Sequence, residues 1–224
     1  MNTRYLSQSI LTALLIVVAC SAEIQVNAQE SATRHYVLPD FVKGSVLMIN
    51  GKTEDAVMNY NMVTEEMIFE KGDTKLAMTN LGAVDTVYLG TRKFIPHGKF
   101  FYEVLLSDKI SLFKKHKCNL LQAGTPAGYG GTSETSATTS ISVLVNSGNM
   151  YKLQLPKEYR VKDASQFWIL KDNSEFIITS ERQLLKIFPQ ISKELEQFIK
   201  QNKLNVRKQE DLIIIITKCN ELLC

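Results

Sequence analysis

Short apolar runs separated by turn residues dominate the chain from residue 42 onward. Residues 42–49 alternate apolar and polar side chains and lead into Asn50-Gly51, a dipeptide that strongly indicates a β-hairpin turn. Aromatic residues such as Tyr88 and Phe101 favour strands, and no helix-length segment with a 3.6-residue period intervenes. The pattern therefore predicts an antiparallel meander rather than parallel β-α-β units. The expected strands are residues 42–49, 56–62, 66–70, 74–78, 84–89, 99–106, 110–115, 141–145, 150–155, 166–171 and 175–179.

From residue 180 the apolar side chains recur at helical spacing and no longer at strand spacing. Ser180 and Gln183 have the spacing of a helix capping box, and apolar residues then recur at three- and four-residue steps up to Phe198. Pro189 falls inside this run, so it must kink the helix or begin a second one. Residues 209–224 also place apolar side chains on one helical face, although a strand is the alternative for their isoleucine run.

These patterns predict the α+β class: a mainly antiparallel sheet or sandwich, followed by two or three C-terminal helices. We expect a β-rich domain over residues 29–179 and a helical segment over residues 180–224. Residues 124–140 contain four Gly and many hydroxyl side chains, and they therefore predict a long flexible loop. Tyr129 lies between two Gly in this loop, so it is a candidate contact for a ligand or partner. The alternative is a linker in which Tyr129 has no role.

The first 28 residues have the layout of a secretory signal peptide. Arg4 precedes an apolar core over residues 10–22, which would reach about 20 Å as a helix, less than the hydrocarbon layer of roughly 30 Å. Small residues before Gln29 provide a cleavage site after Ala28. Cys20 offers a second interpretation, because the sequence before it resembles a bacterial lipobox in which the cysteine is lipidated. Both place the mature chain outside the cytoplasm, in the periplasm, at the outer membrane or secreted, and without a transmembrane span.

Removal of this segment would leave Cys118, Cys219 and Cys224. An odd number of cysteines in an oxidising compartment leaves at least one thiol free or paired between chains. A Cys118–Cys219 disulfide is one candidate, since it would join the two halves of the chain. Three free thiols are the alternative.

Composition limits the class of function. The 224 residues include 26 Lys+Arg and 23 Asp+Glu, and this net charge of +3 does not indicate a nucleic-acid partner. A hydrophobic content of 45% argues against disorder. The carboxylates Glu65 and Glu66 are expected on the solvent side of a strand. Lys114, Lys115 and Lys117 are expected at a solvated sheet edge.

The sequence lacks the common residue patterns of catalytic, metal and phosphate-binding sites. The chain has no G-x-S-x-G elbow and three histidines: His35 near the expected mature N-terminus, His97 in an expected turn, and His116. His116 and Cys118 would share one face of a strand, which supplies half of a zinc site without a second pair. The glycines of the 124–140 loop lack the Lys-Ser/Thr of a phosphate-binding loop. We therefore predict no catalytic residue, cofactor or metal site.

Four blocks carry a resemblance to other proteins: FVKGSVLMINGKTEDAVMNYNMVTEEMIFEKG, KFFYEVL, AGYGGTS and the C-terminal LLKIFPQISKELEQFIKQNKLNVRKQEDL. They are similar to blocks of a family of uncharacterised secreted and envelope proteins of Bacteroidetes bacteria. The resemblance covers most of the mature chain. It implies export, a β-rich body and a helical tail, and it implies no activity and no catalytic residues.

We expect an exported protein of the cell envelope with a non-catalytic binding or structural role, whose partner is an envelope protein or a glycan. One alternative is a secreted hydrolase that acts on glycans or peptides through carboxylates dispersed in the sequence. Another is an envelope assembly adaptor that uses its C-terminal helices. A buried acidic pair in a cleft would favour the hydrolase, and an exposed apolar helix face would favour the adaptor.

The processing of the N-terminus can be tested on the exported product. We expect the mature chain to begin at Gln29, so that Cys20→Ala leaves export intact. The intact mass of the exported protein measures this directly. A diacyl or triacyl mass on Cys20 would contradict the prediction and identify a lipoprotein.

Overall fold

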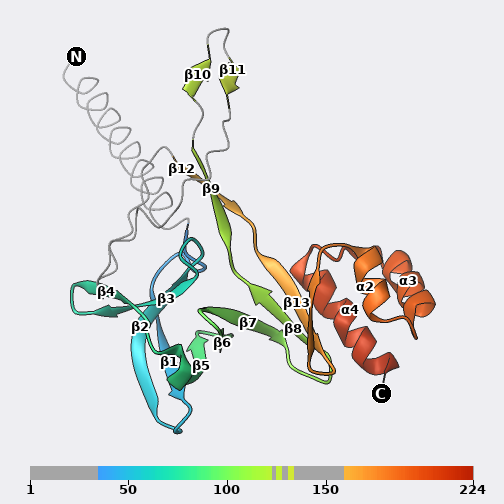
Figure 1. Cartoon of the computed structure of the whole chain (residues 1–224), viewed down its shortest axis with the longest axis horizontal. Helices are drawn as coiled ribbons and strands as arrows, with labels where there is room; N and C mark the ends of the chain where they lie inside the picture. Colours follow the sequence, from blue (N-terminus) through green and yellow to red (C-terminus); the bar gives the residue numbers. More distant parts are fainter. Residues whose placement is uncertain (1–34, 123–124, 128–130, 134–158, 224) are drawn as a thin grey trace, which may run out of the picture.

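The computed structural model describes residues 35–122, 125–127, 131–133 and 159–223. Within these ranges ten antiparallel strands form one sheet, in the order β14-β13-β8-β7-β6-β5-β1-β2-β3-β4, and three helices follow it in the chain (Figure 1). The α+β prediction is therefore confirmed. The strands of the sheet are β1 (Val42–Met48), β2 (Thr53–Asn61), β3 (Glu66–Lys71), β4 (Thr74–Ala77), β5 (Val84–Leu89), β6 (Arg92–His97), β7 (Phe100–Leu106), β8 (Ser111–Lys115), β13 (Gln166–Lys171) and β14 (Ser174–Ile178).

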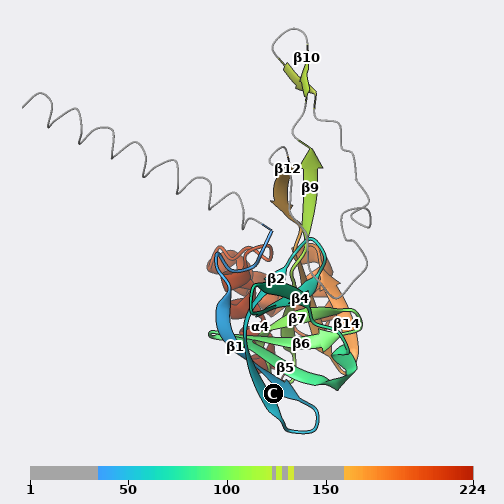
Figure 2. The same cartoon turned by 90° about the vertical axis from the view of Figure 1, so that its left-hand side faces the viewer.

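A two-stranded arm extends the sheet. β9 (Cys118–Gln122) and β12 (Tyr159–Asp163) pair antiparallel and continue β8 and β13 away from the body of the molecule (Figures 1 and 2). β10 (Thr125–Ala127) and β11 (Gly131–Ser133) pair within the segment predicted as a flexible loop, so the prediction missed this hairpin. Tyr129 and the strands expected over residues 141–145 and 150–155 lie outside the described residues.

The sequence pattern also missed β6, because Pro96 lies within it. Proline lacks the N–H group that the interior of a sheet uses. Pairing between β5 and β6 ends at Val87 and Phe94, however, so the ladder on that side stops before Pro96 is reached. His97 is the last residue of β6 and does not lie in a turn, which corrects the expectation from the sequence.

The predicted turn between β1 and β2 is confirmed. Gly51 has a φ of 82°, a value that glycine adopts without strain. The N–H of Met48 donates to the carbonyl oxygen of Lys52 over 2.8 Å, and the Asn50 side chain accepts from the N–H of Lys52 over 3.0 Å. Local turn chemistry therefore sets the register of the first hairpin.

Two apolar clusters pack against one face of the sheet. Side chains alternate along β8, so Leu112 and Lys114 share a face, and His116 follows directly after the strand. Leu112 belongs to the cluster beneath the helices, whereas the ring of His116 lies about 6 Å from those of Tyr60 and Phe94 in the other cluster. The helices thus cover one half of this face. The sheet covers the other half itself, because it curls and brings β3 into contact with β7.

Gly44 permits the close approach of β1 and β5 within the curl. A Cβ atom at this position would lie 2.3 Å from the carbonyl oxygen of Tyr88 and 2.9 Å from Cε of Met58. The first of these atoms belongs to the backbone and cannot rotate away. Any side chain at Gly44 would therefore push β1 away from β5.

The three helices are α2 (Glu181–Ile187), α3 (Ser192–Gln201) and α4 (Gln209–Leu222). The predicted cap is confirmed, because the Ser180 hydroxyl accepts from the N–H of Gln183 over 3.3 Å. Pro189 falls in the turn between α2 and α3, so the predicted apolar run forms two helices. Among the described residues, no helix is both long and apolar enough to cross a membrane.

The last segment is a helix and not the alternative strand. Of the apolar face predicted for this helix, Leu212, Ile215, Ile216 and Cys219 are buried against the sheet, and Leu222 is partly buried. Asn220 fixes its C-terminal end: the side-chain oxygen accepts from the N–H of Ile110 over 2.8 Å, and the amide donates to the carbonyl of Ile110 over 3.0 Å.

Leu195→Asp tests the packing of α3. Leu195 is fully buried, so the substitution would bury a carboxylate without a partner and cost several kcal/mol, a large part of the stability of a typical domain. We expect a large fall in Tm, measured by thermal unfolding followed by circular dichroism. Lys193→Asp places the same side chain at an exposed position of α3 and should leave Tm nearly unchanged. An unchanged Tm for Leu195→Asp would mean that α3 does not pack against α2 and α4 through Leu195.

Candidate functional site

The curled half of the sheet encloses an apolar cleft of about 450 Å³, within the range of ligand-binding sites. Met58, Phe69 and Leu76 lie in direct register across β2, β3 and β4. Ala56, two residues before Met58 on β2, also lines the cleft, and its small side chain leaves space beside this row. The apolar lining consists of Val46, Met48, Ala56, Met58, Phe69, Leu76, Ala77, Met78 and Val84. Its three methionines are flexible side chains that adapt to different apolar ligands.

Charged side chains of both signs form the rim of this cleft. Glu54, Asp55 and Glu70 line it, with Lys71 as the opposing charge. Glu54 lies 2.7 Å from Lys52, and Glu70 lies 3.8 Å from Lys75. Both ion pairs are exposed to solvent, where water and salt screen them. With Lys71, these two lysines balance the three carboxylates of the rim.

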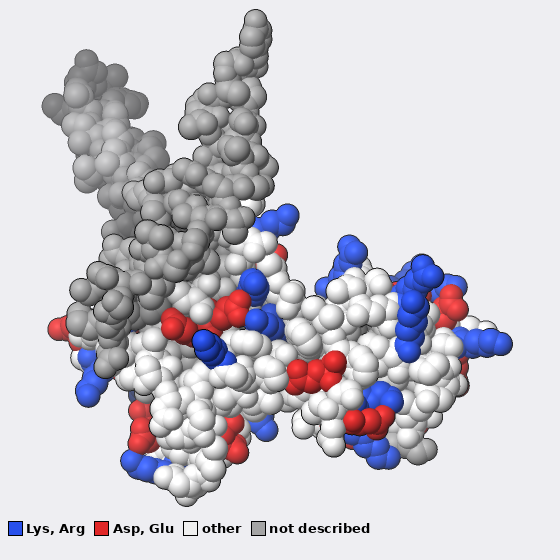
Figure 3. Space-filling view, in the orientation of Figure 1, with Lys and Arg blue, Asp and Glu red and all other residues white. Residues whose placement is uncertain are grey.

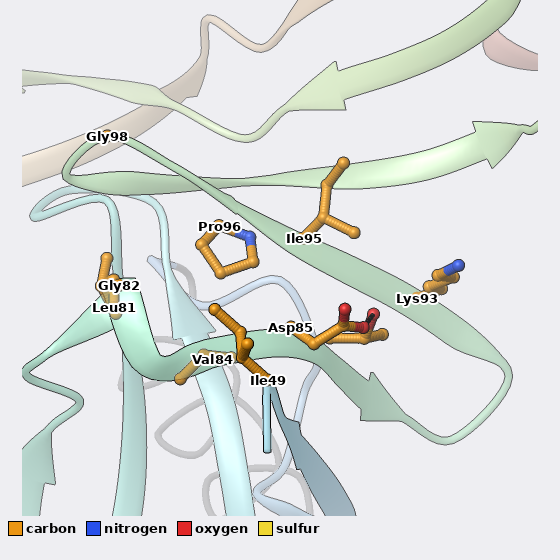
Figure 4. A pocket seen from close by; sticks show the side chains of 10 residues that line it. Ile49, Leu81, Gly82, Val84, Asp85, Lys93, Ile95, Pro96 and Gly98 are labelled. Atoms are coloured by element: carbon orange, nitrogen blue, oxygen red, sulfur yellow. Dashed lines mark hydrogen bonds between the residues drawn. The ribbon is translucent and has the colours of Figure 1, made fainter. Parts of the chain in front are cut away.

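Val84 also borders a second, shallower hollow of about 690 Å³ between η1 (Leu81–Ala83) and the strands β5 and β6 (Figure 4). Asp85 of β5 lies near its centre, and Lys93 of β6 lies at one end (Figure 4). The hollow is open, since Ile49 on its border keeps 67% of its surface exposed. The cleft is therefore the more enclosed of the two.

A buried acid–base pair joins β7 to the residue after β8. Nε2 of His116 lies 2.5 Å from Oε2 of Glu103, and Nε of Arg92 lies 3.4 Å from Oε1 of the same carboxylate. Glu103 and His116 are each 4% exposed. A charge at this depth is expensive unless it is paired, and Glu103 has two nitrogen partners.

The pKa shifts identify the charge state of the pair. Burial lowers the pKa of His116, and its hydrogen bond with Glu103 opposes that shift only in part. Burial would raise the pKa of Glu103, but His116, Arg92 and Lys114 outweigh burial and hold this pKa below its ordinary value. At neutral pH Glu103 is therefore ionised and His116 is neutral, with its Nε2–H donating to the carboxylate.

This pair lies between the two apolar clusters. Glu103 and Lys114 are opposite each other in β7 and β8, and Nζ of Lys114 donates to Oε1 of Gln209 over 3.1 Å at the start of α4. The polar row therefore links the curled half of the sheet to the helical half. Glu103 and His116 line neither the cleft nor the hollow described above. Glu103 and His116 can stabilise each other in the interior, but a substrate in the cleft or in the hollow would not reach them.

The two candidate disulfide cysteines are free thiols in this structure, and they lie in separate clusters. Cys118 packs beside Val63, whereas Cys219 belongs to the cluster beneath the helices. Burial raises the pKa of both thiols to about 12, so neither is a thiolate at neutral pH. Cys20, the candidate for lipidation, and Cys224 lie outside the described residues.

The structure corrects the expected positions of His97 and His116, and it shows that His35 is buried. His35 is buried, and this burial, with the charge of Lys75, lowers the pKa of His35 to about 4. His97 lies 3.5 Å from Glu175 of β14. His116 falls between β8 and β9, so it does not share a strand with Cys118. Within the described ranges, no three His, Cys, Asp or Glu side chains come together as a metal site.

The lysines of β8 also differ from expectation, because β8 is an interior strand and not an edge. Nζ of Lys115 lies 2.8 Å from Oε2 of Glu65, and the Lys115 side chain is 15% exposed. Oε2 of Glu66 is buried. Basic and acidic side chains are interspersed on the face shown in Figure 3 and do not gather into a patch of one sign.

The sequence analysis missed the cleft and the buried pair. A signal for the pair exists, because Glu103 is the one charged residue in the apolar run FFYEVLL. A signal for the cleft is weaker: Met48, Met58 and Met78 come from separate strands or loops, and their convergence depends on the curl. Comparisons with protein-family models, curated proteins and solved structures find no match to this chain.

Glu103→Gln tests the charge state of the buried pair. Because the pKa of Glu103 is lowered on folding, its carboxylate stabilises the fold above the ordinary carboxyl pKa, and this contribution is lost as the pH falls through the lowered value. We expect the substitution to reduce the free energy of unfolding by about 2 kcal/mol at pH 7. The difference should shrink at pH 3, as measured by urea unfolding.

Glu54→Gln is the matched control, since it removes an exposed carboxylate from the same sheet and should change stability little at either pH. A deficit for Glu103→Gln that is equal at pH 7 and pH 3 would contradict an ionised Glu103.

Proposed function

We propose that this chain is an exported protein of the bacterial cell envelope with a non-catalytic binding role, and that its ligand occupies the cleft enclosed by β1–β4. Export is supported by the N-terminal pattern of Arg4, an apolar core and small residues before Gln29. Binding is supported by one observation above all: a cleft of about 450 Å³ lined by flexible apolar side chains. Such concave apolar surfaces with a few polar groups at the rim are the usual form of a ligand site.

The distribution of carboxylates supports binding over hydrolysis. A hydrolase needs an acid and a base that reach the same substrate bond. Glu54 and Asp55 stand at the exposed rim of the cleft. Glu103, which has a histidine partner, is enclosed and lines neither opening.

The packing of the C-terminal helices argues against the adaptor alternative. An adaptor would use an exposed apolar helix face, but the stripe of α4 is buried against the sheet. Ile214 is the large hydrophobic residue of α4 that stays exposed, at 46%. A single exposed isoleucine is ordinary for a soluble surface.

Binding to the cleft can be measured with the uncharged fluorescent dye N-phenyl-1-naphthylamine. We expect saturable fluorescence enhancement with the mature chain, because the apolar lining takes the dye out of water. Ala56→Leu fills the space beside the Met58–Phe69–Leu76 row and should weaken dye affinity at least tenfold. The measurement is a fluorescence titration on variants whose circular dichroism matches that of the parent.

Ala164→Leu makes the same change between β12 and β13, outside the cleft, and should bind the dye as the parent does. The proposal fails if the parent shows no saturable binding, or if Ala56→Leu binds as tightly as Ala164→Leu.

A further inference from the structure

The shallow hollow between β5 and β6 forms where these two strands separate. They pair as far as Val87 and Phe94, and beyond these residues they diverge (Figure 4). Pro96 follows on β6 and has no N–H group with which to continue the ladder. The strands therefore stay apart at this point, and the space between them opens to solvent as the hollow of about 690 Å³.

A β-bulge directs Asp85 into this hollow. In the pairing of β5 with β1 the register shifts between Leu47 and Met48, and Asp85 is the residue of β5 that the shift leaves without a partner in β1. Bulges re-aim side chains and are frequent beside functional sites. Oδ1 of Asp85 accepts from the hydroxyl of Thr86 over 2.7 Å. The bulge and Thr86 together hold a carboxylate near the middle of the hollow, where a ligand can reach it (Figure 4).

Charged and apolar side chains occupy different parts of the hollow. Lys93 lies at one end, beyond Asp85, and Pro96, Ile49 and Leu81 line the other end (Figure 4). Among the described residues neither Asp85 nor Lys93 forms an ion pair, so both charges are available to a ligand. Ile49 keeps 67% of its surface exposed, which gives a ligand apolar area to cover. From one end to the other, the hollow offers an ammonium group, a carboxylate and an apolar wall.

This order of groups selects a ligand even though the two charges cancel. A complementary ligand carries an anionic group for Lys93, an ammonium group for Asp85 and an apolar part beyond them. An α-amino acid with an apolar side chain has all three attached to one carbon atom. A fatty acid lacks the ammonium group. Phosphatidylethanolamine has its groups in the wrong order, because its phosphate lies between the ammonium group and the acyl chains and would fall beside Asp85.

We propose that this hollow binds a free α-amino acid with an apolar side chain, such as leucine. The carboxylate of the ligand pairs with Lys93, its ammonium group donates to Asp85, and its side chain packs on Ile49 and Leu81. The hollow and the cleft are separate openings that share one lining residue, Val84. The inference therefore goes beyond the proposed function and does not depend on it.

A titration of the ¹⁵N-labelled mature chain with L-leucine, followed by NMR at low ionic strength, tests the site. We expect progressive, saturable shifts of the backbone amide signals of Asp85, Thr86 and Lys93. Three analogues each lack one recognised part: leucinamide lacks the carboxylate, 4-methylpentanoate lacks the ammonium group, and glycine lacks the side chain. Each should bind at least about threefold more weakly than leucine, because it loses one ion pair or the apolar contact.

Two variants assign the charged contacts. Asp85→Asn removes the partner of the ammonium group, so leucine and 4-methylpentanoate should then bind with nearly equal affinity. Lys93→Met removes the partner of the carboxylate and should make leucine and leucinamide equivalent in the same way. Asp73→Asn and Lys43→Met make the same changes at exposed positions outside both openings, and they should bind leucine as the parent does. All four variants should give the circular dichroism of the parent, which shows that they are folded.

The outcomes separate this inference from the proposed function. The inference is overturned if leucine produces no saturable shift of the three amide signals or if the analogues bind as tightly as leucine. It is also overturned if Asp85→Asn keeps the preference for leucine over 4-methylpentanoate. Saturable binding of N-phenyl-1-naphthylamine would then leave the proposed function standing. If leucine binds as expected and the dye does not bind, the proposed function fails and this inference stands.

Discussion

The architecture depends on the burial of one apolar face of a ten-stranded sheet. The helices contact strands at one end of the sheet order: α2 contacts β14, and α4 contacts β7 and β8. The strands at the other end cover their own apolar face by curling, which brings β3 into contact with β7. Gly44 permits the close approach of β1 and β5, and the small side chain of Ala56 leaves space in the cleft.

The boundary between the two apolar clusters is polar, and its charges are paired. Glu103 has His116 and Arg92 as partners, and Lys114 beside it bonds to Gln209 of α4. Glu103 is the buried charge of this row, and without partners its carboxylate would cost several kcal/mol. These contacts form only when the curled strands and α4 are correctly placed relative to each other, so they favour the folded arrangement. Protonation of Glu103 would weaken them, so we expect acid to destabilise this part of the fold.

Much of the fold could be predicted from local signals. The turn at Asn50-Gly51, the cap at Ser180 and the apolar face of α4 depend on residues close in sequence, and all three are confirmed. β6 was not predicted because Pro96 argues against a strand. The sequence does not show that the pairing of β6 with β5 ends at Phe94, before Pro96 is reached. The candidate site could not be predicted, because the cleft arises from the curl and Glu103 meets His116 across two strands.

The central claim is that the curl forms a ligand site, and methionine methyl NMR tests it most directly. Mature protein labelled with ¹³C at methionine methyl groups can be titrated with N-phenyl-1-naphthylamine. Met48, Met58 and Met78 line the cleft, whereas Met62 and Met67 do not. The account predicts progressive, saturable shifts of the first three signals and little change in the other two. Shifts of equal size in all five, or none, would contradict it.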